Sequence, residues 1–148
     1  MFETAEREWN MRKITAIMVM ILTAALLLTG CAKGAKLSEK FDEETVKAEA
    51  MKAVEYFNQR DYASILAMGS EELKAALTEE AFAQAVDPYL DKNGAFMEIT
   101  KTAVMGNTDK ETGDEYGGVV MVGKYENGKI QFVISFDEEM KLVQFVIR

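Results

Sequence analysis

Residues 126–136 read Glu-Asn-Gly-Lys-Ile-Gln-Phe-Val-Ile-Ser-Phe and decide the fold class of this 148-residue chain. The first four of these residues are the pattern most typical of a tight β-hairpin turn. After the turn, large apolar residues alternate with smaller or polar ones, which is the period of a strand with one buried face. The residues predicted to face the core are Ile130, Phe132, Ile134 and Phe136.

The same period of two extends to both sides of this hairpin. Residues 119–122 are predicted to form the preceding strand, residues 97–105 an earlier one, and residues 142–147 the last one. Lys101 shares the parity of the apolar residues in its strand, and a buried lysine needs a partner. We therefore expect a bulge between Phe96 and Ile99 that turns Lys101 outward.

The preceding half of the chain has the period of helices. Apolar residues in segment 42–58 recur at helical spacing, and Asp61, Ser70 and Thr78 open three further helices as N-cap residues. Pro88 is expected to kink the last helix. Helices followed by four antiparallel strands predict an α+β fold, in which the helices pack on one face of a curved four-stranded sheet.

Composition excludes several classes of function. The chain has no histidine, which removes imidazole metal ligands and histidine-dependent nucleophilic catalysis. Its net charge of −8 is opposite to what nucleic-acid phosphates require, so we predict no nucleic-acid partner. We also predict no cofactor, no metal site and no catalytic residue.

The N-terminus has the organisation of a secretory signal. Arg12-Lys13 precedes an apolar run over residues 14–28. As a helix this run spans roughly 22 Å, which is less than the ~30 Å core of a bilayer. Residues 1–10 contain three glutamates and only one arginine, which is atypical of a signal start, so translation begins either at Met1 or, as we favour, at Met11.

The signal ends in Leu28-Thr29-Gly30-Cys31, which resembles the lipobox of bacterial lipoproteins. In that class the cysteine thiol receives a diacylglyceryl group, and a dedicated peptidase then cleaves just before it. The alternative for Cys31 is a small buried core residue. The resemblance implies a mature protein that begins at Cys31 and is held on the extracytoplasmic face of the cell membrane by its lipid.

These observations divide the chain into three segments. Residues 1–30 are the signal peptide, residues 31–41 carry the lipid and a short tether, and residues 42–148 form one domain. Because the domain is acidic, we expect the lipid, and not a basic protein face, to attach it to the membrane.

A second resemblance covers residues 43–147. The segments 58–62, 72–78 and 94–96 are similar to the domain of unknown function 3887 family. This family belongs to the cone-shaped fold of nuclear transport factor 2 and the cystatin-like proteins. The resemblance implies a sheet that wraps round the helices and leaves a conical pocket, and it implies an accessory or binding role.

Two interpretations of the cone remain open. In the first, apolar side chains line an open pocket that has tyrosine hydroxyls at its mouth. In the second, the same side chains fill the cone as a solid core. The candidate pocket residues are Phe57, Tyr62, Phe82, Tyr89, Tyr125, Phe132 and Ile134.

Acidic residues offer one further candidate site. Asn107, Asp109 and Glu111 begin like a calcium-binding EF-hand loop, but Thr112 and Gly118 stand where that loop needs glycine and glutamate. We therefore predict a solvated hairpin loop. Three classes of function remain: a membrane-anchored binding or accessory module, which we favour, a structural or protein-interaction component of the envelope, and a small pocket enzyme.

Overall fold

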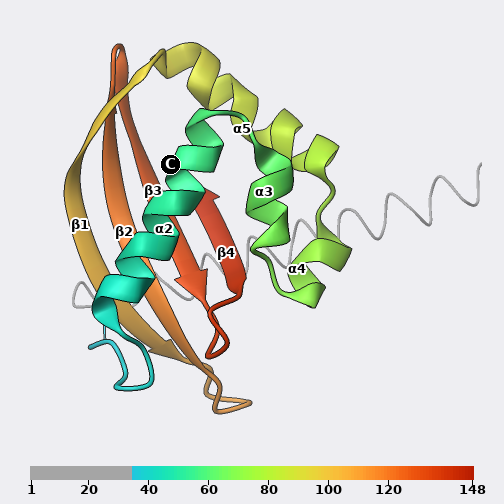
Figure 1. Ribbon diagram of the computed structural model, residues 1–148, viewed down its shortest axis with the longest axis vertical. Helices are drawn as coiled ribbons and strands as arrows, with labels where there is room; N and C mark the ends of the chain where they lie inside the picture. The colour runs from blue at the N-terminus through green and yellow to red at the C-terminus, as the bar shows by residue number, and fades with distance from the viewer. Residues whose placement is uncertain (1–34) are drawn as a thin grey trace, which may run out of the picture. The chain divides into compact units, whose positions relative to one another are not determined.

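A computed structural model describes residues 35–148 (Figure 1). The signal segment 1–30, the alternative start at Met11 and the proposed lipid site Cys31, with Leu28, Thr29 and Gly30 before it, lie outside these residues. The helices are α2 (Glu43–Asn58), α3 (Tyr62–Ala67), α4 (Glu71–Ala76) and α5 (Glu79–Asn93), and the strands are β1 (Phe96–Thr108), β2 (Glu115–Tyr125), β3 (Gly128–Phe136) and β4 (Leu142–Ile147). Within residues 35–148, no helix is both long and apolar enough to span a bilayer.

Each helix begins after an N-cap residue, and three of the four caps are those predicted at Asp61, Ser70 and Thr78. The side chains of Asp42, Asp61, Ser70 and Thr78 each accept a hydrogen bond from a backbone N–H in the first turn of their helix. Helix α5 continues through Pro88 and ends at Gly94, whose φ of 75° suits a residue without a side chain.

The sheet is an antiparallel meander in the order β1-β2-β3-β4. It curves around α2, which crosses one face, while α3, α4 and α5 lie on the side of β4 (Figure 1). This arrangement confirms the predicted α+β class and the curved four-stranded sheet. The hairpin between β2 and β3 turns at Glu126-Asn127, since Tyr125 pairs with Gly128.

Strand β1 carries two bulges where the sequence predicted one. The register shifts between Phe96 and Glu98 and again between Ile99 and Lys101, and the side chain of Lys101 is exposed as expected. Each bulge inserts one residue and reverses the parity of the strand. The simple alternation predicted for residues 97–105 was therefore wrong at Met97, which is 56% exposed, and at Ala103 and Met105, which lie on the side of the sheet away from the core residue Val119.

The folded domain starts earlier than the predicted boundary at residue 42. The carbonyl of Ala35 accepts a hydrogen bond of 2.8 Å from the N–H of Gly106 in β1, and Phe41 is buried in the core. The ammonium of Lys40 lies 2.7 Å from Glu115 and 2.8 Å from Glu138. Residues 35–41 thus pack with the domain.

Candidate functional site

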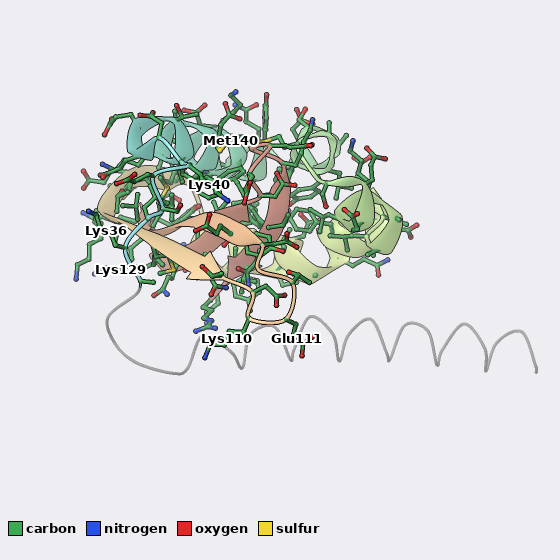
Figure 2. The ribbon with its side chains drawn as sticks, turned by 90° about the horizontal axis from the view of Figure 1, so that it is seen from below. Lys36, Lys40, Lys110, Glu111, Lys129 and Met140 are labelled. Atoms are coloured by element: carbon green, nitrogen blue, oxygen red, sulfur yellow. The ribbon has the colours of Figure 1, made fainter. Side chains whose placement is uncertain are left out.

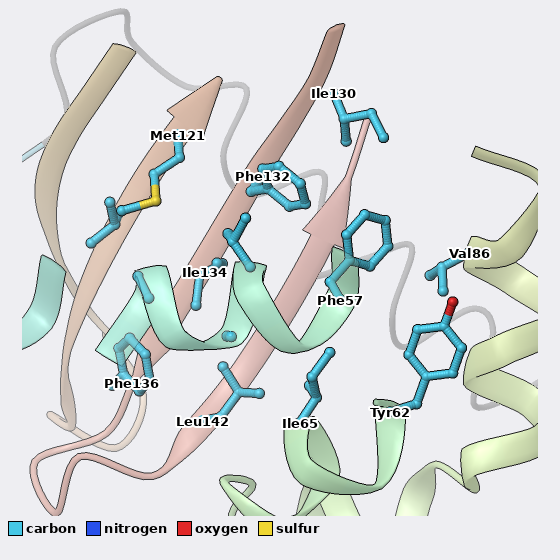
Figure 3. Close-up of a cluster of buried hydrophobic side chains, with 14 of the residues drawn as sticks. Phe57, Tyr62, Ile65, Val86, Met121, Ile130, Phe132, Ile134, Phe136 and Leu142 are labelled. Carbon is cyan, nitrogen blue, oxygen red and sulfur yellow. The ribbon is translucent and has the colours of Figure 1, made fainter. Parts of the chain in front are cut away.

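The apolar pocket candidates fill the space between α2 and the sheet. Phe57, Phe132 and Ile134 have no exposed surface, and Phe82 is 5% exposed. The rings of Phe57 and Phe132 meet edge to face with their centroids 5.3 Å apart, and Figure 3 shows the two side chains pointing toward each other. Around these four residues the structure favours the solid core over the open pocket.

The tyrosine candidates do not gather at one opening. Tyr62 is buried and donates its hydroxyl hydrogen to Asp87, whereas Tyr125 is buried and donates to Asn58. Burial raises the pKa of both hydroxyls above the usual tyrosine value. Tyr89 lies 38% exposed on α5. The two buried hydroxyls therefore connect structural elements and are not grouped at a pocket mouth.

Sequence reasoning missed a polar cluster that contains the Tyr62 hydroxyl. Arg60 has a left-handed backbone with φ of 56°, and its guanidinium lies 2.7 Å from Asp87 and 2.6 Å from Asp91. These contacts join the turn after α2 to α5 at the surface. Because the charges are paired and partly solvated, we interpret the cluster as a structural clamp.

The acidic loop between β1 and β2 folds around Asp109. Its carboxylate oxygen Oδ1 accepts hydrogen bonds from the backbone N–H groups of Glu111 and Thr112. Such bonds are typical of a self-stabilised turn. In the part of the chain from residue 35 onward, no three His, Cys, Asp or Glu residues are placed to hold a metal ion.

An open groove lies elsewhere, between α2 and the first two strands. Its volume is about 430 Å³, which falls within the range of small-molecule sites. The floor consists of Met51, Ile99 and Met121, and the remaining lining residues are Glu44, Lys47, Ala48 and Thr102. The groove is the strongest candidate binding site among the described residues, and none of the seven predicted pocket residues lines it.

The way α2 packs explains the groove. Its buried stripe, which includes Ala50, Ala53 and Phe57, lies on the core, so the neighbouring stripe faces β1 only partly covered. That second stripe holds positions 44, 47, 48 and 51, which fall on one helix face. The helical spacing of these four positions beside the main apolar stripe is the feature of the sequence from which the groove could have been predicted.

The charges at the rim favour a neutral or cationic ligand. The ammonium of Lys47 lies 2.6 Å from Glu43 and 3.2 Å from Glu44. The hydrogen bond to Glu43, and to a lesser extent the one to Glu44, raises the pKa of Lys47. Because two carboxylates surround one ammonium, the rim carries a net negative charge that disfavours anions.

Comparison with known proteins identifies the domain that contains this groove. Residues 50–145 match the family described as "Protein of unknown function (DUF3887)". The chain belongs to this family. The family resemblance predicted from the sequence is confirmed. The match spans the second half of α2, the other three helices and nearly all of the four strands, so it includes Met51, Ile99, Thr102 and Met121 of the groove, whereas Glu44, Lys47 and Ala48 precede it.

A solved structure shares this architecture. The NMR structure of a protein from Ruminococcus gnavus ATCC 29149 is 35% identical and superposes with a TM-score of 0.66, covering 76% of this chain and 96% of that chain. No curated protein matches the chain. The similarity shows that nearly the whole length of a related protein corresponds to the domain described here.

Proposed function

We propose that this protein is a lipid-anchored extracytoplasmic lipoprotein whose DUF3887 domain is a non-catalytic binding module. The observation that carries the anchor is the sequence Leu28-Thr29-Gly30-Cys31 at the end of a signal-like segment. Support comes from the fold, which begins at Ala35 and leaves only residues 32–34 between Cys31 and the domain. We assign the curved sheet and its helices to the cone type of nuclear transport factor 2.

The groove between α2 and β1 is the proposed ligand site. Its apolar floor and negatively charged rim suit a small apolar molecule that is neutral or cationic. The only ionisable groups that line it are Glu44 and Lys47, which pair with each other. The hydrogen bonds raise the pKa of Lys47 and move it farther from the near-neutral range that suits a general acid or base, which supports binding over acid–base catalysis.

Metabolic labelling with palmitate tests the anchor. The wild-type protein should incorporate the label, and the mass of the membrane-extracted protein should match acylated residues 31–148. The Cys31→Ser variant should remain an unlabelled precursor. Wild-type protein recovered unmodified from the soluble fraction would overturn the anchor.

Titration with the neutral fluorescent amine N-phenyl-1-naphthylamine tests the groove. Met51→Gln should weaken binding of this probe about tenfold, because part of a buried apolar contact becomes polar. Met97→Gln makes the same change at an exposed position outside the groove and should leave binding unchanged. Equal affinity in the two variants would place the probe elsewhere.

A further inference from the structure

The sheet has a second face, which points away from α2 and is built differently from the core face. We call it the outer face, because its residues alternate with core residues such as Val119 and Phe132. One row crosses all four strands in register. The row is apolar throughout and consists of Ala103, Val120, Val133 and Val146.

Basic residues gather at one end of the outer face. Lys101 pairs across strands with Val122, which pairs with Gln131, and Arg148 exchanges backbone hydrogen bonds with Gln131. The next row holds Glu98, Lys124 and Lys129. Cross-strand partners project on the same side of a sheet. These rows thus place four basic residues and one acidic residue beside the apolar row.

The rest of the domain has the opposite charge. The four helices together carry ten acidic and four basic residues, and the whole chain has a net charge of −8. Figure 2 shows Lys129 on the side of the sheet away from α2, and Lys110 and Glu111 at the tip of the β1–β2 loop. That loop is acidic and lies beyond the opposite end of the apolar row. The outer face is therefore the basic and apolar side of an acidic molecule, a local surface that the net charge did not indicate when the lipid alone was expected to attach the domain to the membrane.

The start of the fold limits how far this face can be from a membrane. The carbonyl of Ala35 accepts a hydrogen bond from the backbone N–H of Gly106 in β1, and only residues 32–34 separate Ala35 from Cys31. Four residue steps of extended chain reach at most about 14 Å. If Cys31 is acylated, the sheet is held at the bilayer surface, where even a weak contact has a high effective concentration.

We propose that the outer face docks onto an anionic lipid bilayer. The apolar row then lies at the headgroup boundary, and the basic residues contact lipid phosphates. The proposal rests on the proposed lipid anchor only for bringing the face to the membrane. The charge decides the orientation, since the acidic helices are repelled by an anionic surface and the outer face is attracted to it. Docking in this way turns α2 away from the bilayer, so the groove beside it is open to the extracytoplasmic side.

Vesicle binding by the domain without its lipid (residues 34–148) tests the proposal. All core residues among residues 35–148 lie within this segment, and the R. gnavus protein, 96% of which is covered by this chain, was solved in solution, so we expect the segment to fold alone. At low ionic strength the segment should bind mixed vesicles of phosphatidylglycerol and phosphatidylcholine, and added salt should dissociate it from them. It should not bind vesicles of phosphatidylcholine alone. Lys101→Gln combined with Lys129→Gln should weaken binding about 30-fold.

The matched control is Lys74→Gln combined with Lys92→Gln, which removes the same charge from the helical side and should leave vesicle binding unchanged. Equal losses in the two double variants would overturn the proposal, as would absence of binding to anionic vesicles. Self-association through the outer face, seen by ultracentrifugation without lipid, would assign a second copy as its partner. Palmitate labelling at Cys31 is measured separately, so loss of the anchor and loss of the docking face are distinguishable.

Discussion

On the inner face of the sheet, Phe132 and Ile134 are completely buried in the main hydrophobic cluster, whereas their neighbours on the outer face, Val133 and Ser135, lie outside this cluster, although Val133 is only 7% exposed. The cross-strand neighbours of Val133 on this face are Val120 and Val146. Both faces come from the same alternating strands. Alternation of apolar and polar residues therefore defines the two faces of a strand, while the elements that cover a face decide whether it becomes the core.

The difference between the faces predicts unequal costs of truncation. Phe132→Ala should lower the free energy of unfolding by about 3–5 kcal/mol, because it removes a ring that packs edge to face on Phe57 and leaves a cavity. Urea unfolding of residues 34–148 measures the change. Gln131→Ala, one residue earlier on the outer face, should cost less than about 0.5 kcal/mol. A loss of unfolding free energy well below this range in Phe132→Ala would favour the open-pocket interpretation instead.

A stricter version of the comparison uses the same substitution at adjacent positions of β2. Val119→Ala should cost about 2 kcal/mol, because Val119 is fully buried in the core. Val120→Ala should cost under about 1 kcal/mol, mainly through reduced strand preference and lost contact with neighbouring valines. Similar costs in chemical denaturation would mean that the outer face is covered as well.

We expect the pH dependence of stability to come partly from the ion pair between Lys40 and Glu115 at the start of β2. The hydrogen bond from Lys40 lowers the pKa of Glu115 below its ordinary value of 4.5. The native state therefore binds fewer protons than the unfolded chain, so this stabilisation is present above pH 4.5 and is lost as pH falls through the lowered pKa. Lys40→Gln should reduce the acid sensitivity of the melting temperature slightly, since the pair is solvated. A steeper acid dependence in the variant would contradict this assignment.

Local sequence predicted most of the secondary structure. The caps Asp42, Ser70 and Thr78 and the stretch from Gly128 to Phe136 each have a structure fixed by neighbours within a few residues. The candidate pocket was less predictable. Whether Phe57 meets Phe132 or lines a void depends on how closely α2 approaches β3, where Phe132 lies 75 residues farther along the chain than Phe57.

The sequence by itself determined the α+β class, the order of the elements and the family, and residues 28–31 carry the motif on which the lipoprotein proposal rests. Periods of 3.6 and 2, caps and short motifs are local properties, so they can be read without a structure. The tertiary structure alone decided that the predicted pocket side chains pack as core, that a groove opens beside α2, and that basic residues collect on the outer face. Two one-residue bulges in β1 reset which side chains share a face, and pairing across strands then brings Lys101, Lys129 and Arg148 to one end of the sheet.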